Sequence, residues 1–372
     1  MQTGNLPKRK TTLFLIASLI AILIVMPATG RTANQMGPSK ETVSLEEVAR
    51  SDRQWTGVAV ARDGRIFVNY PFWSESPPII SVAVLSKTGE PSPYPNEEWN
   101  SWNPSKSPKD HFVCVQSVYT DRKGYLWNLD SGNPRFQGVV KDGPKLLRID
   151  PELNAIAQAI YFDESIAPKA SYLNDVRVDS QRDYAYITDS GLGAIIVVDL
   201  ATETARRVLS SDPSTKSEGV KIVIDGKEWR RADGAIPQVH SDGIALDPAN
   251  QYLYYQALTG RRLYRIDTAW LRDDALTEKE LGKKVQFVAK TGVADGIIFG
   301  LDGRLYLSGL EEKAIKAYTI GKTVGVVVKD PLLEWPDSFS LGPDGSLYVT
   351  TSQINLGPNP PTPYRIFKLK GR

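Results

Sequence analysis

The sequence is poor in the residue types on which many site chemistries depend. Its 372 residues include one cysteine and two histidines. A single cysteine excludes an intrachain disulfide, and two histidines exclude a histidine-rich zinc site. No G-x-S-x-G elbow, P-loop or G-x-G-x-x-G pattern occurs, which removes the common hydrolase, nucleotide and dinucleotide motifs. Cys114 lies in the apolar run 112–115, so we expect a buried core residue rather than a reactive thiol.

Net charge is also small, and it comes from one end of the chain. The formal net charge is +2, and residues 1–30 contain three basic residues and no acidic one. Without that segment, 42 Lys and Arg stand against 43 Asp and Glu. The rest of the chain therefore has no charge excess that would indicate a nucleic-acid partner or a membrane-surface partner.

The one long apolar run, 13–26, has 14 residues, whereas a transmembrane helix needs about 20. The basic cluster 8–10 precedes it, and Pro27 followed by the small residues 28–30 ends it, which is the layout of a secretory signal peptide. We predict a signal peptide at 1–30, with an uncleaved N-terminal anchor as the alternative, and a single domain at 31–372. The expected location is secreted or periplasmic, without membrane contact after cleavage.

A repeat extends through the chain. Each copy begins with a polar residue and continues with an alternating strand, a turn, and a second strand that carries an aromatic residue at a fixed place. Asp-Gly pairs occupy several of the turns, and this pair is typical of tight hairpins. The six copies are residues 56–68, 116–128, 174–187, 242–255, 295–307 and 337–349.

Further strand-like runs follow each copy, which gives four strands per unit and six units. This pattern predicts an all-β fold, a six-bladed β-propeller with four-stranded blades around a central channel. Residues 71–110 are expected to form a long loop around one outer strand, 221–229 a small hairpin and 271–282 a short helix. The strand-like run 364–369 is expected to close the ring against the first blade. A closed ring leaves no sheet edge exposed, so we expect a monomer.

The first position of the repeat is polar in all six copies. Because inner strands line the channel of a propeller, these side chains are expected to form a ring at the channel mouth. Three adjacent carboxylates repel one another unless a positive group lies among them, and either Ca²⁺ or an ammonium ligand would supply it. In the alternative interpretation, each side chain caps a loop in its own blade. The six residues are Thr56, Gln116, Asn174, Asp242, Asp295 and Asp337.

Two further groups are candidates at the same end of the channel. Asp130 and Asp189 each begin an Asp-Ser-Gly sequence after a second strand, where they are either ligand-binding residues or ordinary turn residues. His240 lies two residues before Asp242, close enough in the chain to act as an acid or a base at the mouth. A loop histidine without a catalytic role is the alternative.

Four segments of the sequence resemble the major royal jelly protein/yellow family, and the resemblance covers about residues 45–370. This resemblance implies a secreted six-bladed propeller. Insect members include dopachrome-converting enzymes, salivary proteins that bind biogenic amines, and storage proteins. The segments are 126–134, 184–200, 240–273 and 335–353.

A more distant resemblance is to the gluconolactonase-like propellers, which hold a divalent metal with a Glu, an Asn and an Asp. Asn174 and Asp242 match the Asn and the Asp, whereas Thr56 stands at the Glu position, so one carboxylate ligand is missing. Asp295 is the candidate to replace it. This resemblance implies a tentative metal site of Asn174, Asp242 and Asp295, with Ca²⁺ as the candidate ion and no other cofactor indicated.

Three hypotheses for function follow. In the first, an aromatic amine or catechol-like small molecule binds at the channel mouth, where Asp242, Asp295 or His240 moves a proton in a tautomerase-like isomerisation. In the second, the protein is a Ca²⁺-dependent lactone hydrolase. In the third, it is a non-catalytic scaffold whose loop 71–110 recognises a protein or a glycan.

Overall fold

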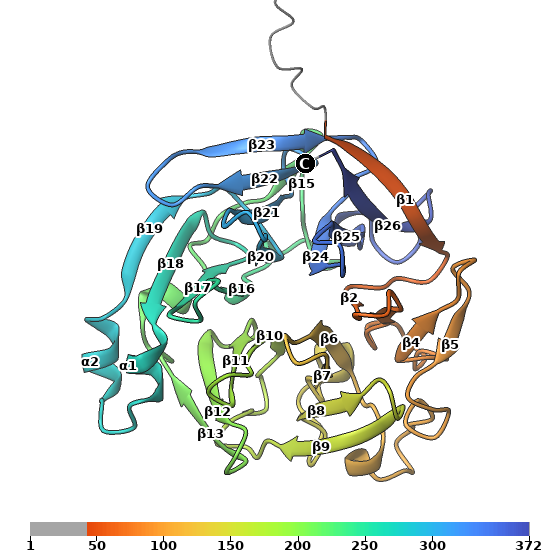
Figure 1. The fold of residues 1–372 in the computed structure, drawn as a ribbon, viewed down its shortest axis with the longest axis horizontal. Coiled ribbons are helices and arrows are strands. Elements are labelled where there is room, and N and C mark those ends of the chain that lie inside the picture. The colour runs from red at the N-terminus through yellow and green to blue at the C-terminus, as the bar shows by residue number, and fades with distance from the viewer. Residues whose placement is uncertain (1–42, 372) are drawn as a thin grey trace, which may run out of the picture. The chain divides into compact units, whose positions relative to one another are not determined.

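The computed structural model describes residues 43–371, which form six antiparallel four-stranded sheets around one axis (Figure 1). Each sheet is one blade, and the blades follow one another around the ring in chain order. The predicted all-β six-bladed propeller is therefore confirmed. The predicted signal peptide at 1–30 lies outside the described residues and stays a prediction.

Each blade contributes its first strand to the wall of the channel. These inner strands are β2 (Val58–Val60), β6 (Val115–Thr120), β10 (Leu173–Asp179), β16 (Ser241–Leu246), β20 (Ile297–Phe299) and β24 (Pro336–Leu341). The second strands are β3 (Ile66–Asn69), β7 (Leu126–Asp130), β11 (Tyr184–Asp189), β17 (Tyr252–Ala257), β21 (Leu305–Gly309) and β25 (Leu347–Thr351).

The two outer strands of each blade face away from the axis. The third strands are β4 (Val82–Leu85), β8 (Lys145–Asp150), β12 (Ala194–Asp199), β18 (Arg262–Asp267), β22 (Ala314–Tyr318) and β26 (Tyr364–Lys370). The outermost strands are β5 (Pro91–Pro93), β9 (Ala155–Tyr161), β13 (Thr204–Val208), β19 (Gln286–Lys290), β23 (Val324–Lys329) and, in the sixth blade, β1 (Ser44–Ser51).

The fixed aromatic residues of the repeat lie on the second strands and fill the space between neighbouring blades. Trp127 of β7 packs with Val176 and Val178 of the next inner strand, and Tyr186 of β11 packs with Ile244 in the same way. Burying large side chains between blades is the main stabilising contribution in such a ring. Five of the six aromatic residues are fully buried; the set is Phe67, Trp127, Tyr186, Tyr254, Tyr306 and Tyr348.

The inner strands all run in the same direction along the channel. At the start of the first two, the Thr56 hydroxyl donates to the Gln116 carbonyl at 3.2 Å, and at their ends the Thr120 hydroxyl donates to the Val60 carbonyl at 3.0 Å. The channel therefore has two chemically different ends. One end gathers the first residues of the repeat, and the other gathers the turns that follow the inner strands.

The ring closes differently from the expectation. β26 is the predicted strand, but it is the third strand of blade six and pairs with β1, from Ser44 opposite Lys370 to Ser51 opposite Tyr364. The N-terminal strand thus completes the last blade, as Figure 1 shows where the red and blue segments lie side by side. The repeat search missed β1 because it precedes the first copy and resembles none of them.

The insertions mostly match the prediction. The hairpin at 221–229 is formed by β14 (Val223–Ile224) and β15 (Lys227–Glu228). The expected single helix is two short helices, α1 (Thr268–Arg272) and α2 (Glu278–Gly282). The segment 71–110 contains two blade strands, β4 and β5, rather than one, together with the short 3-10 helix η1 (Pro108–Asp110).

Three more 3-10 turns connect strands elsewhere: η2 (Pro134–Phe136), η3 (Pro213–Thr215) and η4 (Ile354–Leu356). No helix within residues 43–371 has the length and apolar character needed to cross a bilayer. Cys114 is buried as expected, and burial raises the pKa of its thiol to about 11, so the thiol is unreactive at neutral pH.

Candidate functional site

Most of the predicted ring gathers at one end of the channel. Asn174, Asp242 and Asp337 lie at the starts of β10, β16 and β24, and Asp295 lies just before β20. All four side chains are buried. The Asn174 side-chain amide donates to Asp242 Oδ1 at 2.7 Å, which joins two neighbouring blades across the channel mouth.

A fourth buried carboxylate, Asp175, joins the three aspartates of the ring, and we call Asp175, Asp242, Asp295 and Asp337 the channel carboxylates. Sequence reasoning missed Asp175 because it is the second residue of its repeat copy, where the other copies carry small or apolar residues. Its direct neighbour Asn174 was the only available signal. The nearest cation in an ion pair is Arg177, whose Nη2 lies 3.6 Å from Asp175 Oδ2.

The channel carboxylates hold protons more tightly than ordinary aspartates. Burial, followed by the charges of Asp295 and Asp175, holds the pKa of Asp242 well above its usual range. Burial raises the pKa of Asp295 to about 6. Burial and then the Asp295 charge hold the pKa of Asp337 well above its usual range, and burial also raises the pKa of Asp175 against the opposing effect of Arg177.

Asp242 and Asp295 form a proton-sharing pair. The pKa values of Asp242 and Asp295 depend on each other, and a hydrogen bond between the two carboxyl groups forms when one of them is protonated. Asp242 has the more strongly raised pKa, so it carries the shared proton while Asp295 ionises near pH 6. A pair of this kind offers one acid and one base at the same place near neutral pH.

A tryptophan just before the last repeat copy orients Asp295. The Trp335 indole N–H donates to Asp295 Oδ2 at 2.8 Å, and this bond opposes the rise in the pKa of Asp295. Trp335 is fully buried and packs edge-to-face against Trp229 with ring centroids 4.8 Å apart. Ile222 and Ile224 of the 210–240 insertion lie in the same apolar cluster, so this insertion lies against the blades that carry Asp295 and Asp337. Trp335 lies two residues before the sixth copy of the repeat, so the repeated positions gave no signal for it.

The other two ring positions serve different purposes. The Thr56 hydroxyl accepts from the Asn69 side chain of its own blade at 2.8 Å, as in the loop-capping alternative, and donates to the Gln116 carbonyl of the next blade. The Gln116 side-chain oxygen accepts from the Tyr172 hydroxyl at 2.8 Å, and that hydroxyl accepts from Trp73 at 2.6 Å. Gln116 is therefore hydrogen-bonded to an aromatic group, Tyr172 with Trp73, rather than to the channel carboxylates.

Asp130 and Asp189, which we call the turn carboxylates, are fully buried within their own blades. Asp130 accepts from the backbone N–H of Val113 and Cys114 at 2.7 and 2.8 Å and from Lys145 Nζ at 2.9 Å. Asp189 accepts from the Tyr172 backbone and forms an ion pair with Arg207 at 2.6 Å. These contacts are those of the turn interpretation, and a ligand would have to displace them.

His240 is half-buried between the third and fourth blades. Its Nδ1 accepts from the Ser217 backbone N–H at 2.9 Å, which places the ring proton on Nε2. Burial, and then the charge of Lys216, lowers the pKa of His240, so the ring is neutral at pH 7. Within residues 43–371, no hydrogen bond joins the ring to Asp242 or Asp295, and its acid–base role stays a prediction.

The proposed metal ligands do not converge on one point. Asn174 turns its N–H toward Asp242, and Asp242 bonds with Asp295, so the three groups satisfy one another. Among residues 43–371, no group of three His, Cys, Asp or Glu side chains has the arrangement of a metal site. As arranged, the Asn174 amide turns an N–H donor rather than its oxygen toward Asp242. Metal binding here stays a prediction, and no reaction step is routed through it.

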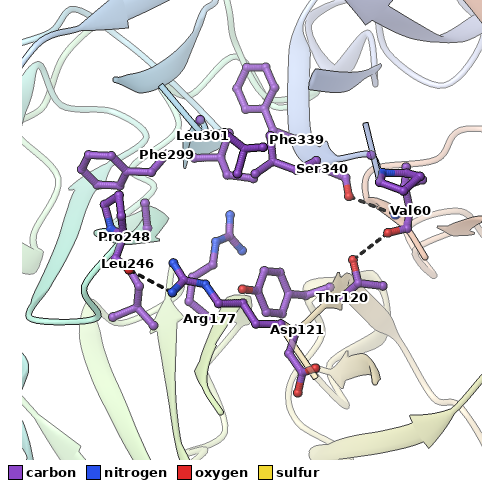
Figure 2. Close-up of a pocket in the computed structure, with 18 of the residues that line it drawn as sticks. Val60, Thr120, Asp121, Arg177, Leu246, Pro248, Phe299, Leu301, Phe339 and Ser340 are labelled. Atoms are coloured by element: carbon purple, nitrogen blue, oxygen red, sulfur yellow. Dashed lines mark hydrogen bonds between the residues drawn. The ribbon is translucent and has the colours of Figure 1, made fainter. Parts of the chain in front are cut away.

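The opposite end of the channel holds a cavity of about 320 Å³, shown in Figure 2. Its walls come from the ends of the inner strands and from the turns that follow them. None of the predicted site residues lines it. The predicted site residues therefore all lie outside this end of the channel.

The fold and the channel define a closed six-bladed propeller with a buried acidic group at one end. The family model for the major royal jelly proteins matches residues 113–354, and the chain belongs to this family. The predicted family is therefore confirmed.

The curated relatives of the chain are honeybee proteins. Major royal jelly protein 5 of Apis mellifera is 25% identical over 231 residues, which cover 58% of this chain and 35% of that protein. Major royal jelly protein 2 is 24% identical over 298 residues, covering 72% of this chain and 63% of the relative. The chain thus spans about a third to under two thirds of the length of these relatives.

Solved structures with similar folds include two enzymes. A gluconolactonase from Xanthomonas campestris superimposes with a TM-score of 0.54 at 12% identity, covering 88% of this chain and 90% of that one. A streptogramin B lyase superimposes with a TM-score of 0.53 at 12% identity, covering 90% and 100%. At this level of identity the likeness concerns the fold alone.

Proposed function

We propose that the channel carboxylates bind a small organic cation, an aromatic or catechol-like amine. The observation that carries this proposal is the imbalance of charge: four buried carboxyl groups face one another, and the cation paired with the group is Arg177. Burial, and then the neighbouring carboxylates, raise the pKa of Asp242, and an ammonium group placed among them would lower their mutual repulsion. Aromatic side chains such as Trp335 stand beside the carboxylates and suit an aromatic ligand.

The proposal predicts that the amine displaces a proton. An ammonium ligand binds the ionised form of Asp295, whose pKa is about 6, so affinity should rise from pH 5 to pH 8. The rise has this sign because protons compete with the cation for the same carboxylate. Calorimetric titration in two buffers with different ionisation enthalpies measures the released proton directly.

Tyramine and 4-ethylphenol form a suitable probe pair, because they share the ring and differ in the ammonium group. We expect tyramine to bind more tightly by tenfold or more, the effect of about one charge-assisted hydrogen bond. Asp242→Asn should remove that preference, whereas the exposed Asp163→Asn should leave it unchanged. Equal binding of the two probes would overturn the proposal.

A tautomerase-like isomerisation is a second candidate function, favoured by the proton-sharing pair. Tautomerisation of a quinone removes a proton from carbon and adds one to oxygen, so it needs a base and an acid. Asp295 above pH 6 is suited to the first role and Asp242 to the second. Loss of the visible absorption of dopachrome measures turnover, and a rate unchanged in Asp242→Asn would contradict this assignment.

We also propose that the protein acts outside the cytoplasm. The basic cluster followed by the apolar run 13–26 supports this location, as does membership of the royal jelly family. N-terminal sequencing of protein recovered from the extracytoplasmic fraction would test it. A mature protein that still begins at Met1 would favour the anchor alternative.

A further inference from the structure

The cavity at the other end of the channel, which we call the basal cavity, has mostly apolar walls. It lies where β2, β6, β16, β20 and β24 end, far along the inner strands from the channel carboxylates. At about 320 Å³ it falls in the size range of small-molecule sites. The apolar side chains of its lining include Leu246, Pro248, Phe299, Leu301 and Phe339, which Figure 2 shows around the cavity.

The charges in this lining are positive. Three guanidinium groups contribute to it, from Arg62, Arg122 and Arg177, against one carboxylate, Asp121. Both oxygens of Asp121 are already occupied: one accepts three backbone N–H groups of the turn after β6, and the other accepts the Trp127 indole N–H at 2.9 Å. The basal cavity therefore presents net positive charge to a ligand.

Arg177 is the buried member of this group, with 7% of its side chain exposed. Nη1 donates to the Val176 carbonyl at 2.7 Å and Nη2 to the Ile297 carbonyl at 3.1 Å, which fixes the guanidinium plane. Its Nε–H has no hydrogen-bond partner. A buried donor without a partner costs stability, and native proteins rarely leave a charged one in that state.

The surroundings of Arg177 combine this free donor with an aromatic face. The guanidinium lies 5.3 Å from the centre of the Tyr119 ring. In Figure 2 the Arg177 side chain lies between the wall with Leu246 and Pro248 and the wall with Thr120. A rigid cationic donor inside an apolar enclosure is the arrangement that recognises an anion with an apolar body.

We propose that the basal cavity binds an organic monocarboxylate with an apolar or aromatic body, whose carboxylate accepts from Arg177. Asp175 lies 3.6 Å from Arg177 and already balances part of its charge. Arg62 and Arg122 are exposed, so solvent screens their charges, and the buried charge that Asp175 leaves on Arg177 suits one negative charge rather than two. The Arg177–Asp175 ion pair links this site to the proposed amine site, but binding of the carboxylate here does not require amine binding there.

The test uses 4-phenylbutyrate and its uncharged amide as probes, titrated into the intact protein by calorimetry. We expect the acid to bind about tenfold or more tightly than the amide, the effect of one charge-assisted hydrogen bond. Phenyl phosphate serves as the dianionic probe and should bind more weakly than the acid. Equal binding of acid and amide, no binding of the acid, or tighter binding of phenyl phosphate would each overturn the proposal.

A variant at the rim of the basal cavity tests where the ligand binds without changing the buried core. Leu301 is 77% exposed at the rim, so Leu301→Glu places a negative charge there without disturbing the fold. It should weaken phenylbutyrate binding about fivefold and leave the amide unchanged. Leu153 is 74% exposed and lies outside the cavity lining, so Leu153→Glu is the matched control. An equal effect of the two variants would place the binding elsewhere.

Arg177 itself is tested by a pair of substitutions. Arg177→Met removes the donor and should abolish the preference for acid over amide, whereas Arg177→Lys keeps the charge and should retain part of it. Far-UV circular dichroism and the melting temperature show whether each variant is folded. An Arg177→Met protein that is folded and still prefers the acid would overturn the assignment.

Discussion

The channel carboxylates and the turn carboxylates are all buried aspartates, and they differ in what surrounds them. Asp130 and Asp189 each have a basic partner within 2.9 Å and several backbone donors. Asp242, Asp295 and Asp337 have each other as nearest charges, and burial raises their pKa values. Burial alone therefore does not distinguish the two sets of aspartates. They differ in compensating cations: both turn carboxylates have one, and among the channel carboxylates Asp175 is paired with Arg177.

The largest effect should come from removing a turn carboxylate. Asp130→Ala leaves the Lys145 ammonium, which is 0% exposed, without its carboxylate partner. Breaking a buried ion pair from one side typically costs about 3–5 kcal/mol of the free energy of unfolding. Urea denaturation measures the loss. The double variant Asp130→Leu with Lys145→Met should recover part of it, and a loss below about 1 kcal/mol in the single variant would contradict this comparison.

The second-largest expected effect is a dependence of stability on pH, which the channel carboxylates cause. The pKa of Asp295 is about 6 in the folded chain against 3.8 for an ordinary aspartate. Between these values the folded chain binds more protons than the unfolded chain, so stability falls as pH rises. The fall should amount to about 2–3 kcal/mol for one such group. Denaturation curves from pH 4 to pH 7 measure it, and Asp295→Asn should flatten the profile. Stability that rises across this window in the native protein would refute the interpretation.

A smaller effect of the opposite sign is expected at Asp242. Asp242→Asn keeps the acceptor for Asn174 and removes one of the interacting acidic groups. We expect the free energy of unfolding to increase by about 1–2 kcal/mol at pH 8, measured as a higher melting temperature. The increase follows because repulsion among the channel carboxylates is relieved. Asp189→Asn is the contrasting variant and should destabilise, since Arg207 then loses its charged partner. A loss of stability in both variants would erase the distinction between the two sets.

The smallest effect concerns the tryptophan that bonds with Asp295. Trp335→Phe removes the indole N–H and should lower stability by about 1 kcal/mol. Because this bond opposes the rise in the pKa of Asp295, its loss should move the midpoint of amine binding to higher pH. Trp229→Phe keeps the indole bond and serves as the control. An unchanged midpoint in Trp335→Phe would show that the indole hydrogen bond does not affect the pKa of Asp295.

Much of the fold could be predicted from the sequence because a propeller repeats its local signals. The Asp-Gly turns are an example: Gly64 has φ of 85° and Gly303 has φ of 74°, conformations that glycine adopts without strain. The aromatic position on each second strand is equally regular because each blade presents the same face to the next. Strand β1 could not be found in this way, since its role depends on pairing with the far end of the chain.

The candidate site was predictable in part. The first position of the repeat brought Asn174, Asp242, Asp295 and Asp337 to one end of the channel because equivalent residues of a ring are neighbours in space. The sequence could not show that Asp130 has a basic partner in Lys145, since that contact depends on the packing of a whole blade. Polar residues at turns have the same local pattern whether they bind the protein or a ligand.

The pairing of β1 with β26 has a consequence for how the protein is made. Glu47 bonds with Arg365, a residue 318 positions later, so the last blade assembles only after nearly the whole chain has left the ribosome. Until then β1 has no partner strand, and its unpaired backbone N–H and C=O groups can pair with strands of other chains. Synthesis that stalls in the sixth blade should therefore give aggregated rather than partly active product.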